Sequence, residues 1–173
     1  WGAQIEDGAF ATSYIPTTSA SVTRTADSAV MTGTNFSSWY NSAASTFVTS
    51  FDIPYAVPSI NGPRVLCTSD AVAETTNGQL IFSPGITGKI GAINSFSAGV
   101  NAGRLDAVAA NTPGAVINAA AAFALNDMAL SVNGATVVAS SVGALPVGVD
   151  RLYIGDGASG VVRLNGHVRS ILY

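Results

Sequence analysis

Alternation of apolar and polar residues is the dominant pattern along this chain, and it predicts β-strands. The clearest run covers residues 46–53, where every second side chain would face a core, and Pro54 ends it. Its predicted inward positions are Phe47, Thr49, Phe51 and Ile53. Shorter runs of the same kind lie at residues 21–26, 63–69, 78–83 and 84–106. Many short strands separated by turn residues are typical of an all-β, two-sheet antiparallel β-sandwich.

The dipeptide Asn133-Gly134 predicts a tight β-hairpin. Both residues accept positive φ, as a type I′ turn requires, and an alternating run flanks the pair on each side. Pairing around this turn places apolar residues opposite one another on one face. The predicted pairs are Val132 with Ala135, Leu130 with Val137, and Met128 with Ala139.

The alanine-rich run at residues 114–125 is compatible with two structures. Four consecutive alanines favour a helix by intrinsic propensity. The apolar residues also recur at every second position, and no Glu, Lys or Arg supplies a polar helical side. We therefore favour a strand. The run is too short and too rich in alanine to span a bilayer, so no membrane insertion is expected.

The C-terminal residues 150–173 read as two strands joined by a glycine-rich turn. In the second strand, His167 and Arg169 would face solvent, as on one side of an antiparallel sheet. Its predicted inward positions are Leu164, Gly166 and Val168. At residues 171–173 the alternation stops and both faces become apolar. We therefore expect the chain to end deep in the protein or against a partner.

A short aromatic segment, NFSSWYN, interrupts the β pattern at residues 35–41. Asn35 could cap a helical turn, which would bring Phe36, Trp39 and Tyr40 to one side. Two roles remain open for these rings: they close one end of the core, or they form a stacking platform for a sugar. The candidate carbohydrate-binding residues are Trp39, Tyr40, Asn35 and Asn41.

Charge is scarce in this chain. Charged residues make up 10% of the 173 residues, and the net charge is −3. A chain without a basic stripe is not expected to bind nucleic acid. The single cysteine, Cys67, excludes an internal disulfide and a zinc site built from cysteines, and we expect it to be buried. The length fits one domain with a sizeable core, and the low charge indicates a surface covered by other copies of the chain.

Catalytic groups are few. The two glutamates, Glu6 and Glu74, have no carboxylate two residues away, and no Gly-x-Ser-x-Gly motif is present. The only histidine, His167, is predicted to be solvated. We therefore expect no enzyme activity and no required cofactor. Calcium remains open as a bound metal, because Asp127, Asp150 and Asp156 lie at predicted strand ends.

Several segments are similar to a known family. They are WGAQIEDGAFATSYIPTTSASVTRTAD, TGTNFSSWYNSAASTFVTSFD, NDMALSVNGATVVASSVGALPVGVDRLYIG and LNGHVRSILY. Together they resemble the concanavalin A-like (laminin-G/pentraxin-type) jelly roll of structural proteins in tailed bacteriophages. The resemblance implies that residues 20–173 form the sandwich. Residues 1–19 would then be an N-terminal arm or the end of a preceding β-module.

The resemblance also implies a function. It points to a non-catalytic structural or adhesion module of a tail fibre or tail-associated protein, on the exterior of the virion. The expected partners are other virion subunits and further copies of the chain, as a trimer by analogy with tail fibres. The alternative is a lectin-like domain that recognises a glycan on the host cell. The composition favours the first function and the fold analogy favours the second, so both remain open.

Overall fold

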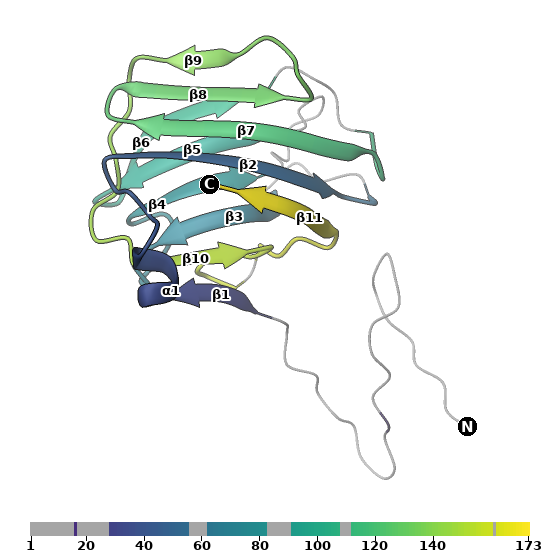
Figure 1. Cartoon of the computed structure of the whole chain (residues 1–173), viewed down its shortest axis with the longest axis horizontal. Helices are drawn as coiled ribbons and strands as arrows, with labels where there is room; N and C mark the ends of the chain where they lie inside the picture. The colour runs from purple at the N-terminus through teal and green to yellow at the C-terminus, as the bar shows by residue number, and fades with distance from the viewer. Residues whose placement is uncertain (1–15, 17–27, 56–61, 83–90, 108–111, 161) are drawn as a thin grey trace.

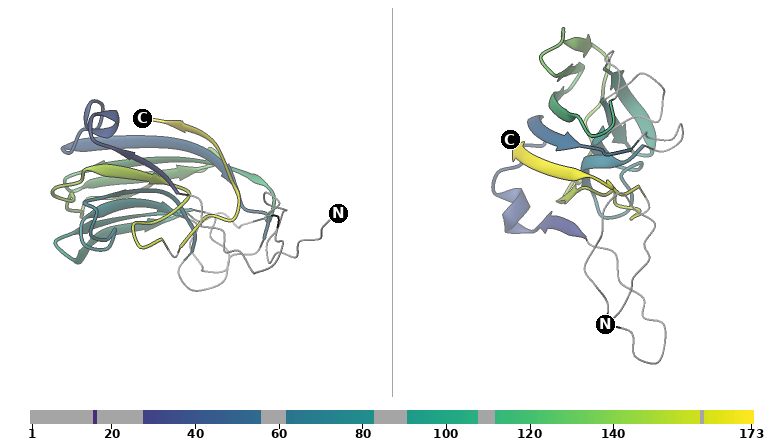
Figure 2. Two further views of the ribbon diagram at one scale, coloured as in Figure 1. Left: turned by 90° about the horizontal axis from the view of Figure 1, so that it is seen from below. Right: turned by 90° about the vertical axis from the view of Figure 1, so that its right-hand side faces the viewer.

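A computed structural model shows two antiparallel β-sheets packed face to face (Figure 1). It describes residues 16, 28–55, 62–82, 91–107, 112–160 and 162–173. Figure 2 shows the two layers from two further sides. The predicted class, an all-β antiparallel sandwich of jelly-roll type, is therefore confirmed.

The sheets contain six and five strands within the described residues. Sheet A has the order β1 (Ala29–Thr32), β10 (Arg151–Ile154), β3 (Arg64–Ser69), β4 (Gly78–Phe82), β5 (Ala92–Ser97) and β6 (Val100–Asp106). Sheet B has the order β11 (His167–Leu172), β2 (Ala44–Asp52), β7 (Val116–Ala124), β8 (Asp127–Val132) and β9 (Val138–Ser140). A four-residue helix, α1 (Thr34–Ser37), follows β1. None of the described helical residues could form a span across a membrane.

The predicted strand at residues 46–53 corresponds to β2 and the residue that follows it, Ile53. Its four predicted inward side chains are all at most 2% exposed, whereas Val48 on the other face is 40% exposed. Asp52 was predicted to face outward, and it does lie on that face. It is nevertheless buried, because His167 and Arg169 of β11 contact its carboxylate from the same side.

The alanine-rich run forms β7, so the strand interpretation is confirmed and the helical alternative is wrong. Every second residue of β7 is buried, with Ala119 and Ala121 at most 1% exposed. Each of these small side chains lies beside larger ones. Ala121 pairs with Phe47 of β2 and Leu130 of β8. The alanines thus leave room for the bulky residues of both neighbouring strands.

The Asn133-Gly134 turn forms as predicted, but the predicted register is wrong. Both residues have positive φ, 53° and 72°, and the Ala135 N–H donates to the Val132 carbonyl at 3.0 Å. The β8–β9 ladder, however, pairs Leu130 with Val138, not with Val137. Residues 135–137 lie outside the ladder, and this irregular stretch shifts the pairing by one residue. Val137 is consequently 57% exposed.

The two strands predicted within residues 150–173 both form, but they do not pair with each other. β10 pairs with β1 and β3 in sheet A, whereas β11 pairs with β2 in sheet B. The glycine-rich segment between them therefore crosses from one sheet to the other. Local alternation predicts each strand correctly, but it carries no information on which sheet a strand joins.

A β-bulge explains the apolar C-terminus. Val168 pairs with Phe51, but the next paired residue is Ser170, so Arg169 is the extra residue. Beyond it the alternation resumes with the opposite phase, and Leu172 is 64% exposed. The side chain of Tyr173 is 48% exposed. An end deep in the protein is therefore wrong, whereas an end against a partner stays a prediction.

Several predictions concern residues outside the described ranges. These are the N-terminal arm at 1–19, where only Pro16 is described, the strand at 21–26, and residues 84–90 of the run at 84–106. Cys67 is fully buried, as predicted, and burial raises the pKa of its thiol.

The turn generates a stability prediction. Gly134→Val should destabilise the fold by about 1–2 kcal/mol, because a β-branched residue resists the positive φ of this position. An added Cβ meets no atom within 4 Å, so the cost is backbone strain alone. The matched control is Ala135→Val, at an exposed neighbouring position without positive φ. Urea unfolding measures both, and equal stabilities of the two variants would contradict the turn geometry.

Candidate functional site: the flank between two edge strands

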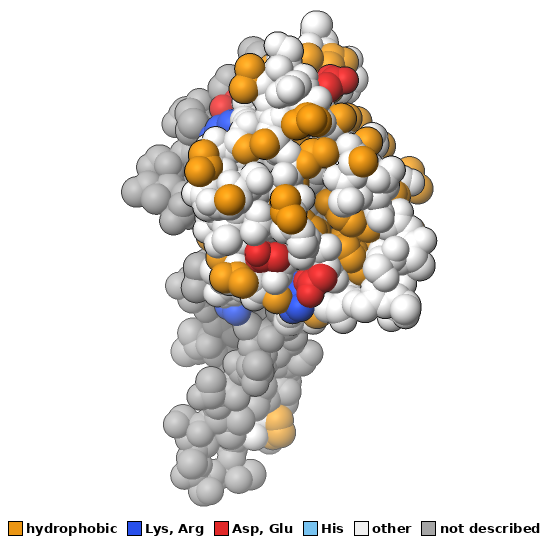
Figure 3. Space-filling view, turned by 90° about the vertical axis from the view of Figure 1, so that its left-hand side faces the viewer, with side chains coloured by type: hydrophobic (Ala, Val, Ile, Leu, Met, Phe, Trp, Pro, Cys, Tyr) orange, Lys and Arg blue, Asp and Glu red, His pale blue; other side chains and the backbone are white. Residues whose placement is uncertain are grey.

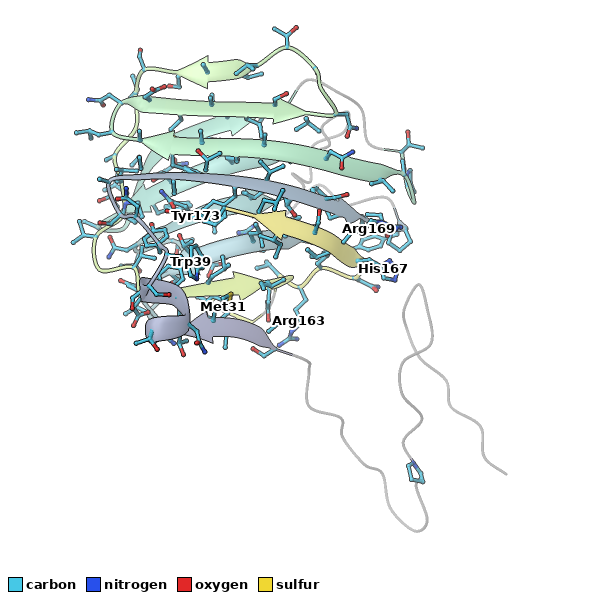
Figure 4. The ribbon with its side chains drawn as sticks, viewed as in Figure 1. Met31, Trp39, Arg163, His167, Arg169 and Tyr173 are labelled. Atoms are coloured by element: carbon cyan, nitrogen blue, oxygen red, sulfur yellow. The ribbon has the colours of Figure 1, made fainter. Side chains whose placement is uncertain are left out.

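One side of the sandwich is bordered by the edge strands of both sheets. Among the described strands, β1 pairs with β10 alone and β11 pairs with β2 alone. Both strands run in the same direction (Figure 1). Ala29 and Val168 line one pocket near their beginnings, and beyond their ends Trp39 contacts Tyr173 (Figure 4). We call the surface between β1 and β11, from this pocket to Trp39 and Tyr173, the flank.

An aromatic cluster occupies one end of the flank. The buried ring of Phe36 stacks on Tyr40, with 4.6 Å between ring centroids, and meets Trp39 edge to face at 5.1 Å. Tyr173 meets Trp39 at 4.7 Å and Phe47 at 5.2 Å. The sequence interpretation did not include Tyr173 in this group. Tyr173 faces inward only because of the bulge at Arg169, and no sequence pattern predicted that bulge.

The structure brings the four predicted site residues together. The Trp39 indole N–H donates to the Asn35 carbonyl at 2.6 Å, and the Asn41 backbone N–H donates to the Tyr173 hydroxyl at 2.7 Å. The Asn35 side chain is exposed, and the Asn41 side chain accepts a bond from the Ala43 N–H at 2.9 Å. Asn35 is not the helix cap, however. Gly33 occupies that position and no side chain caps the helix.

Tyr40 differs from the other three because it faces the interior. Its hydroxyl donates to Gln79 Oε1 at 3.2 Å, and Ser45 donates to the same oxygen at 3.0 Å. Burial, with a smaller contribution from the charge of Tyr173, raises the pKa of Tyr40 to about 12. Tyr40 thus connects the aromatic cluster to the polar residues between the sheets. Trp39 and Tyr173 carry the solvent-facing part of the cluster.

A pocket of about 420 Å³ lies at the other end of the flank. Its walls combine apolar side chains with one guanidinium and one amide. They include Ala29, Ile154, Leu164 and Val168, together with Arg163 and Asn165. Glycine is required at Gly166, because a Cβ there would collide with the backbone oxygen of Asp52. Gly166 itself lines the pocket.

A second polar group lies beside the pocket, at the beginning of β11. Asp52 contacts His167 Nδ1 at 2.9 Å and Arg169 Nη2 at 2.7 Å. The hydrogen bond from His167, assisted by Arg169, lowers the pKa of Asp52 despite its burial. Both side chains extend into solvent, as predicted for His167 and Arg169. The carboxylate is therefore engaged with residues of its own chain.

Several other carboxylates contact groups of their own chain. Glu74 is 3% exposed and accepts a bond from the Ser159 N–H at 3.2 Å, while Glu6 lies outside the described residues. Asp150 pairs with Arg151 at 2.7 Å and Asp156 with Arg163 at 3.3 Å. Within the part of the chain that the structure describes, no group of three or more His, Cys, Asp or Glu side chains could hold a metal ion.

The outer face of sheet A carries a second set of candidate residues. A small apolar cluster there joins Cys67 and Leu80 with the half-buried rings of Phe96 and Tyr153. Asn94 pairs with Leu80 and shares its face. Asn94 Oδ1 is buried without a hydrogen-bond partner, and an unmet acceptor of this kind is uncommon. This face is the alternative location for a ligand.

The comparisons with known proteins agree on the fold. No protein-family model matches the sequence, and no curated protein matches it. Many solved structures are similar, as three examples show. Domains LG4-5 of the mouse laminin α1 chain match with a TM-score of 0.54 and 10% identity, over 84% of this chain and 38% of that chain. The CBM40 of a Ruminococcus gnavus IT-sialidase bound to α2,3-sialyllactose matches with a TM-score of 0.52 and 15% identity, over 75% of this chain and 72% of that chain. A toad ovary galectin with thio-digalactose matches with a TM-score of 0.51 and 10% identity, over 86% of this chain and 98% of that chain. The chain has the concanavalin A-like fold. Identities this low show the fold alone.

The interior position of Tyr40 predicts its behaviour in alkali. The pKa of Tyr40 is raised to about 12 in the folded state. Its contribution to the free energy of unfolding is therefore fully present below the ordinary tyrosine pKa of 10.0, and it is lost as the pH rises from there to about 12. Tyr40→Phe removes this contribution, so stability should fall less steeply over that interval. Thermal melts at a series of pH values measure the slope. Identical slopes for wild type and variant would contradict the interior position of this hydroxyl.

Proposed function

We propose that this protein is a non-catalytic, lectin-like module that binds a glycan along the flank. The observation that carries the proposal is the aromatic surface of Trp39 and Tyr173, which backbone hydrogen bonds connect to the exposed residues Asn35 and Asn41. A sugar ring offers a C–H face to an aromatic surface and hydroxyls to neutral amides. The flank supplies both kinds of partner at one end.

The aromatic surface is held in place before any ligand arrives. Trp39 contacts Phe36 on one side and Tyr173 on the other, and its indole N–H is bonded within its own turn. Tyr173 is fixed in turn by the Asn41 N–H. Binding would therefore order few side chains, which lowers its entropic cost.

Two of the similar structures support the same conclusion. One is a carbohydrate-binding module with bound sialyllactose and the other a galectin with thio-digalactose. Because one fold hosts many functions, this support is secondary to that of the side chains.

Binding at each site is expected to be weak. An aromatic surface with neutral amides gives a dissociation constant on the order of millimolar to high micromolar. Several copies on one assembly would then act together, because each further contact with the same cell surface is effectively intramolecular. A host-cell glycan is the expected target, as the family resemblance implies.

Removal of the aromatic surface tests this function. Trp39→Ala and Tyr173→Ala should each abolish binding on a glycan array, since either change removes one of the two contacting rings. Tyr173 is half exposed, so its variant should keep the fold even if Trp39→Ala does not. Tyr153→Phe, on the outer face of sheet A, is the matched control and should bind normally. Folded wild-type protein that binds no glycan would contradict the proposal.

A second candidate function is assembly in a bacteriophage tail or fibre, on the exterior of the virion. One observation favours it: five large aliphatic side chains are exposed at the end of the sandwich where β7 meets β8, and Figure 3 shows apolar side chains over this end with some acidic and basic ones among them. They are Val72, Val100, Leu125, Val142 and Val147, each 65–74% exposed. Clustered exposed aliphatic residues often mark a protein interface. Other virion subunits or further copies, as in a trimer, would cover this end.

Light scattering tests the assembly function. The wild type should form a homo-oligomer at concentrations of tens of micromolar, because weak interfaces have dissociation constants on that order. Leu125→Lys combined with Val147→Lys should yield monomers, because two charges would then be buried in the contact. Val116→Lys, at the opposite end of β7, is the control and should leave the oligomer intact. A monomeric wild type would contradict this candidate.

A further inference from the structure

We infer that the pocket at the Ala29 and Val168 end of the flank binds an acidic sugar residue, a uronate or a sialic acid, through the guanidinium of Arg163. The inference rests on the proposed glycan-binding function and names the class of glycan. It is carried by the placement of Arg163 in the wall of a pocket of about 420 Å³ (Figure 4). Pockets of roughly 300–1,000 Å³ hold small ligands.

Arg163 is positioned by one neighbour and remains available to another. Its Nε lies 3.3 Å from Asp156 Oδ2, and the side chain is 50% exposed. Asp156 is 8% exposed and also accepts a bond from the Gly157 N–H at 2.8 Å. A guanidinium has five N–H donors, so contact through Nε leaves the terminal nitrogens to bind a carboxylate with two parallel hydrogen bonds.

The charge of the lining favours an anion. Among the described residues that line the pocket, Arg163 alone has a charged side chain, and no carboxylate is present. Asp52 lies nearby, but His167 and Arg169 contact its two oxygens. An entering carboxylate would therefore meet one cation in the wall and no unpaired anion beside it.

The rest of the pocket suits a sugar ring. Ile154, Leu164 and Val168 provide apolar surface for the C–H groups of the ring. The Asn165 amide can donate to and accept from hydroxyls. An inorganic anion would use Arg163 but none of these partners, so the lining favours an acidic sugar over a simple ion.

Backbone hydrogen bonds fix the segment that carries Arg163. The Gly155 N–H donates to the Val65 carbonyl at 2.8 Å, and the Leu164 N–H donates to the Gly155 carbonyl at 2.8 Å. The Arg64 N–H donates to the Val162 carbonyl at 2.9 Å. The segment between β10 and β11 is thus bonded to β3 and closed on itself. Its preorganisation keeps Arg163 at the pocket without a ligand.

The pocket and the aromatic surface are close enough to bind one glycan. From Ala29 to the end of β1 the backbone advances about 10 Å, and from Val168 to Tyr173 about 13 Å, at roughly 3.3 Å per residue with the bulge at Arg169 counted as one step. A short oligosaccharide spans this distance. One sugar would stack on Trp39 and Tyr173 while an acidic one occupies the pocket.

The test compares acidic and neutral sugars that are otherwise alike. Wild-type protein is titrated by NMR with 3′-sialyllactose against lactose, and with methyl β-glucuronide against methyl β-glucoside. We expect the acidic member of at least one pair to bind about tenfold more tightly than its neutral partner. The pair that shows the preference identifies the acid as a sialic acid or a uronate.

Arg163→Gln should remove the preference for the acidic sugar, and Arg163→Lys should restore only part of it because an ammonium lacks the planar fork. The matched control is Arg104→Gln. It removes a guanidinium that contacts Asp106 on β6, at the opposite edge of sheet A from β1, and that is absent from the pocket lining, so the preference should remain.

Three results would overturn the inference: equal binding of acidic and neutral sugars, no binding of either acidic probe, or an acid preference that survives Arg163→Gln. Its failure is distinguishable from that of the proposed function. Neutral sugars that bind and depend on Tyr173 would leave the proposed function intact. Acidic sugars that depend on Arg163 but not on Tyr173 would contradict the aromatic surface while supporting the pocket.

Discussion

The pairing of β2 with β7 is the constraint on which the rest of the sandwich depends. Its register places small side chains of one strand beside large ones of the other: Phe47 opposite Ala121, Thr49 opposite Ala119, and Phe123 opposite Ser45. A slip of one residue would turn every apolar side chain of one strand toward solvent. The same size matching extends to β8, where Ala121 faces Leu130. Four alanines in sequence therefore belong to a strand here, because large neighbours on both sides fill the volume that the alanines leave free.

Local alternation predicted the strands themselves, since a half-buried strand must alternate. It predicted β2 and β7 with their inward residues, and the two positive φ angles at Asn133-Gly134. It did not predict relations that depend on the whole fold. The bulge at Arg169 reverses the phase of β11, so that Tyr173 contacts Phe47 while Leu172 faces solvent. The same limit applies to β10 and β11, which look like a hairpin along the chain but belong to different sheets.

Part of the candidate site could likewise be predicted from the sequence, and part of it could not. Its aromatic turn was visible in the sequence, because Asn35, Trp39, Tyr40 and Asn41 are close along the chain. The partner ring of Tyr173 and the pocket around Arg163 were not visible, because they depend on β1 and β11 bordering the same side of the molecule. Edge strands of this kind need protection from uncontrolled pairing, and α1 with its aromatic cluster covers one end of the flank. The pocket around Arg163 lies in the part of the flank that α1 does not cover, and there we propose that an acidic sugar binds.

The location of the bound glycan is the most direct test of this account. In a backbone and indole NMR titration with 3′-sialyllactose and with methyl β-glucuronide, the account predicts shifts that follow the flank. The Trp39 indole N–H and the amides of Asn41, Asn165 and Gly166 should move together, while those of the outer face of sheet A stay unchanged. Shifts centred on Asn94 and Tyr153 of that face, with none along the flank, would contradict it.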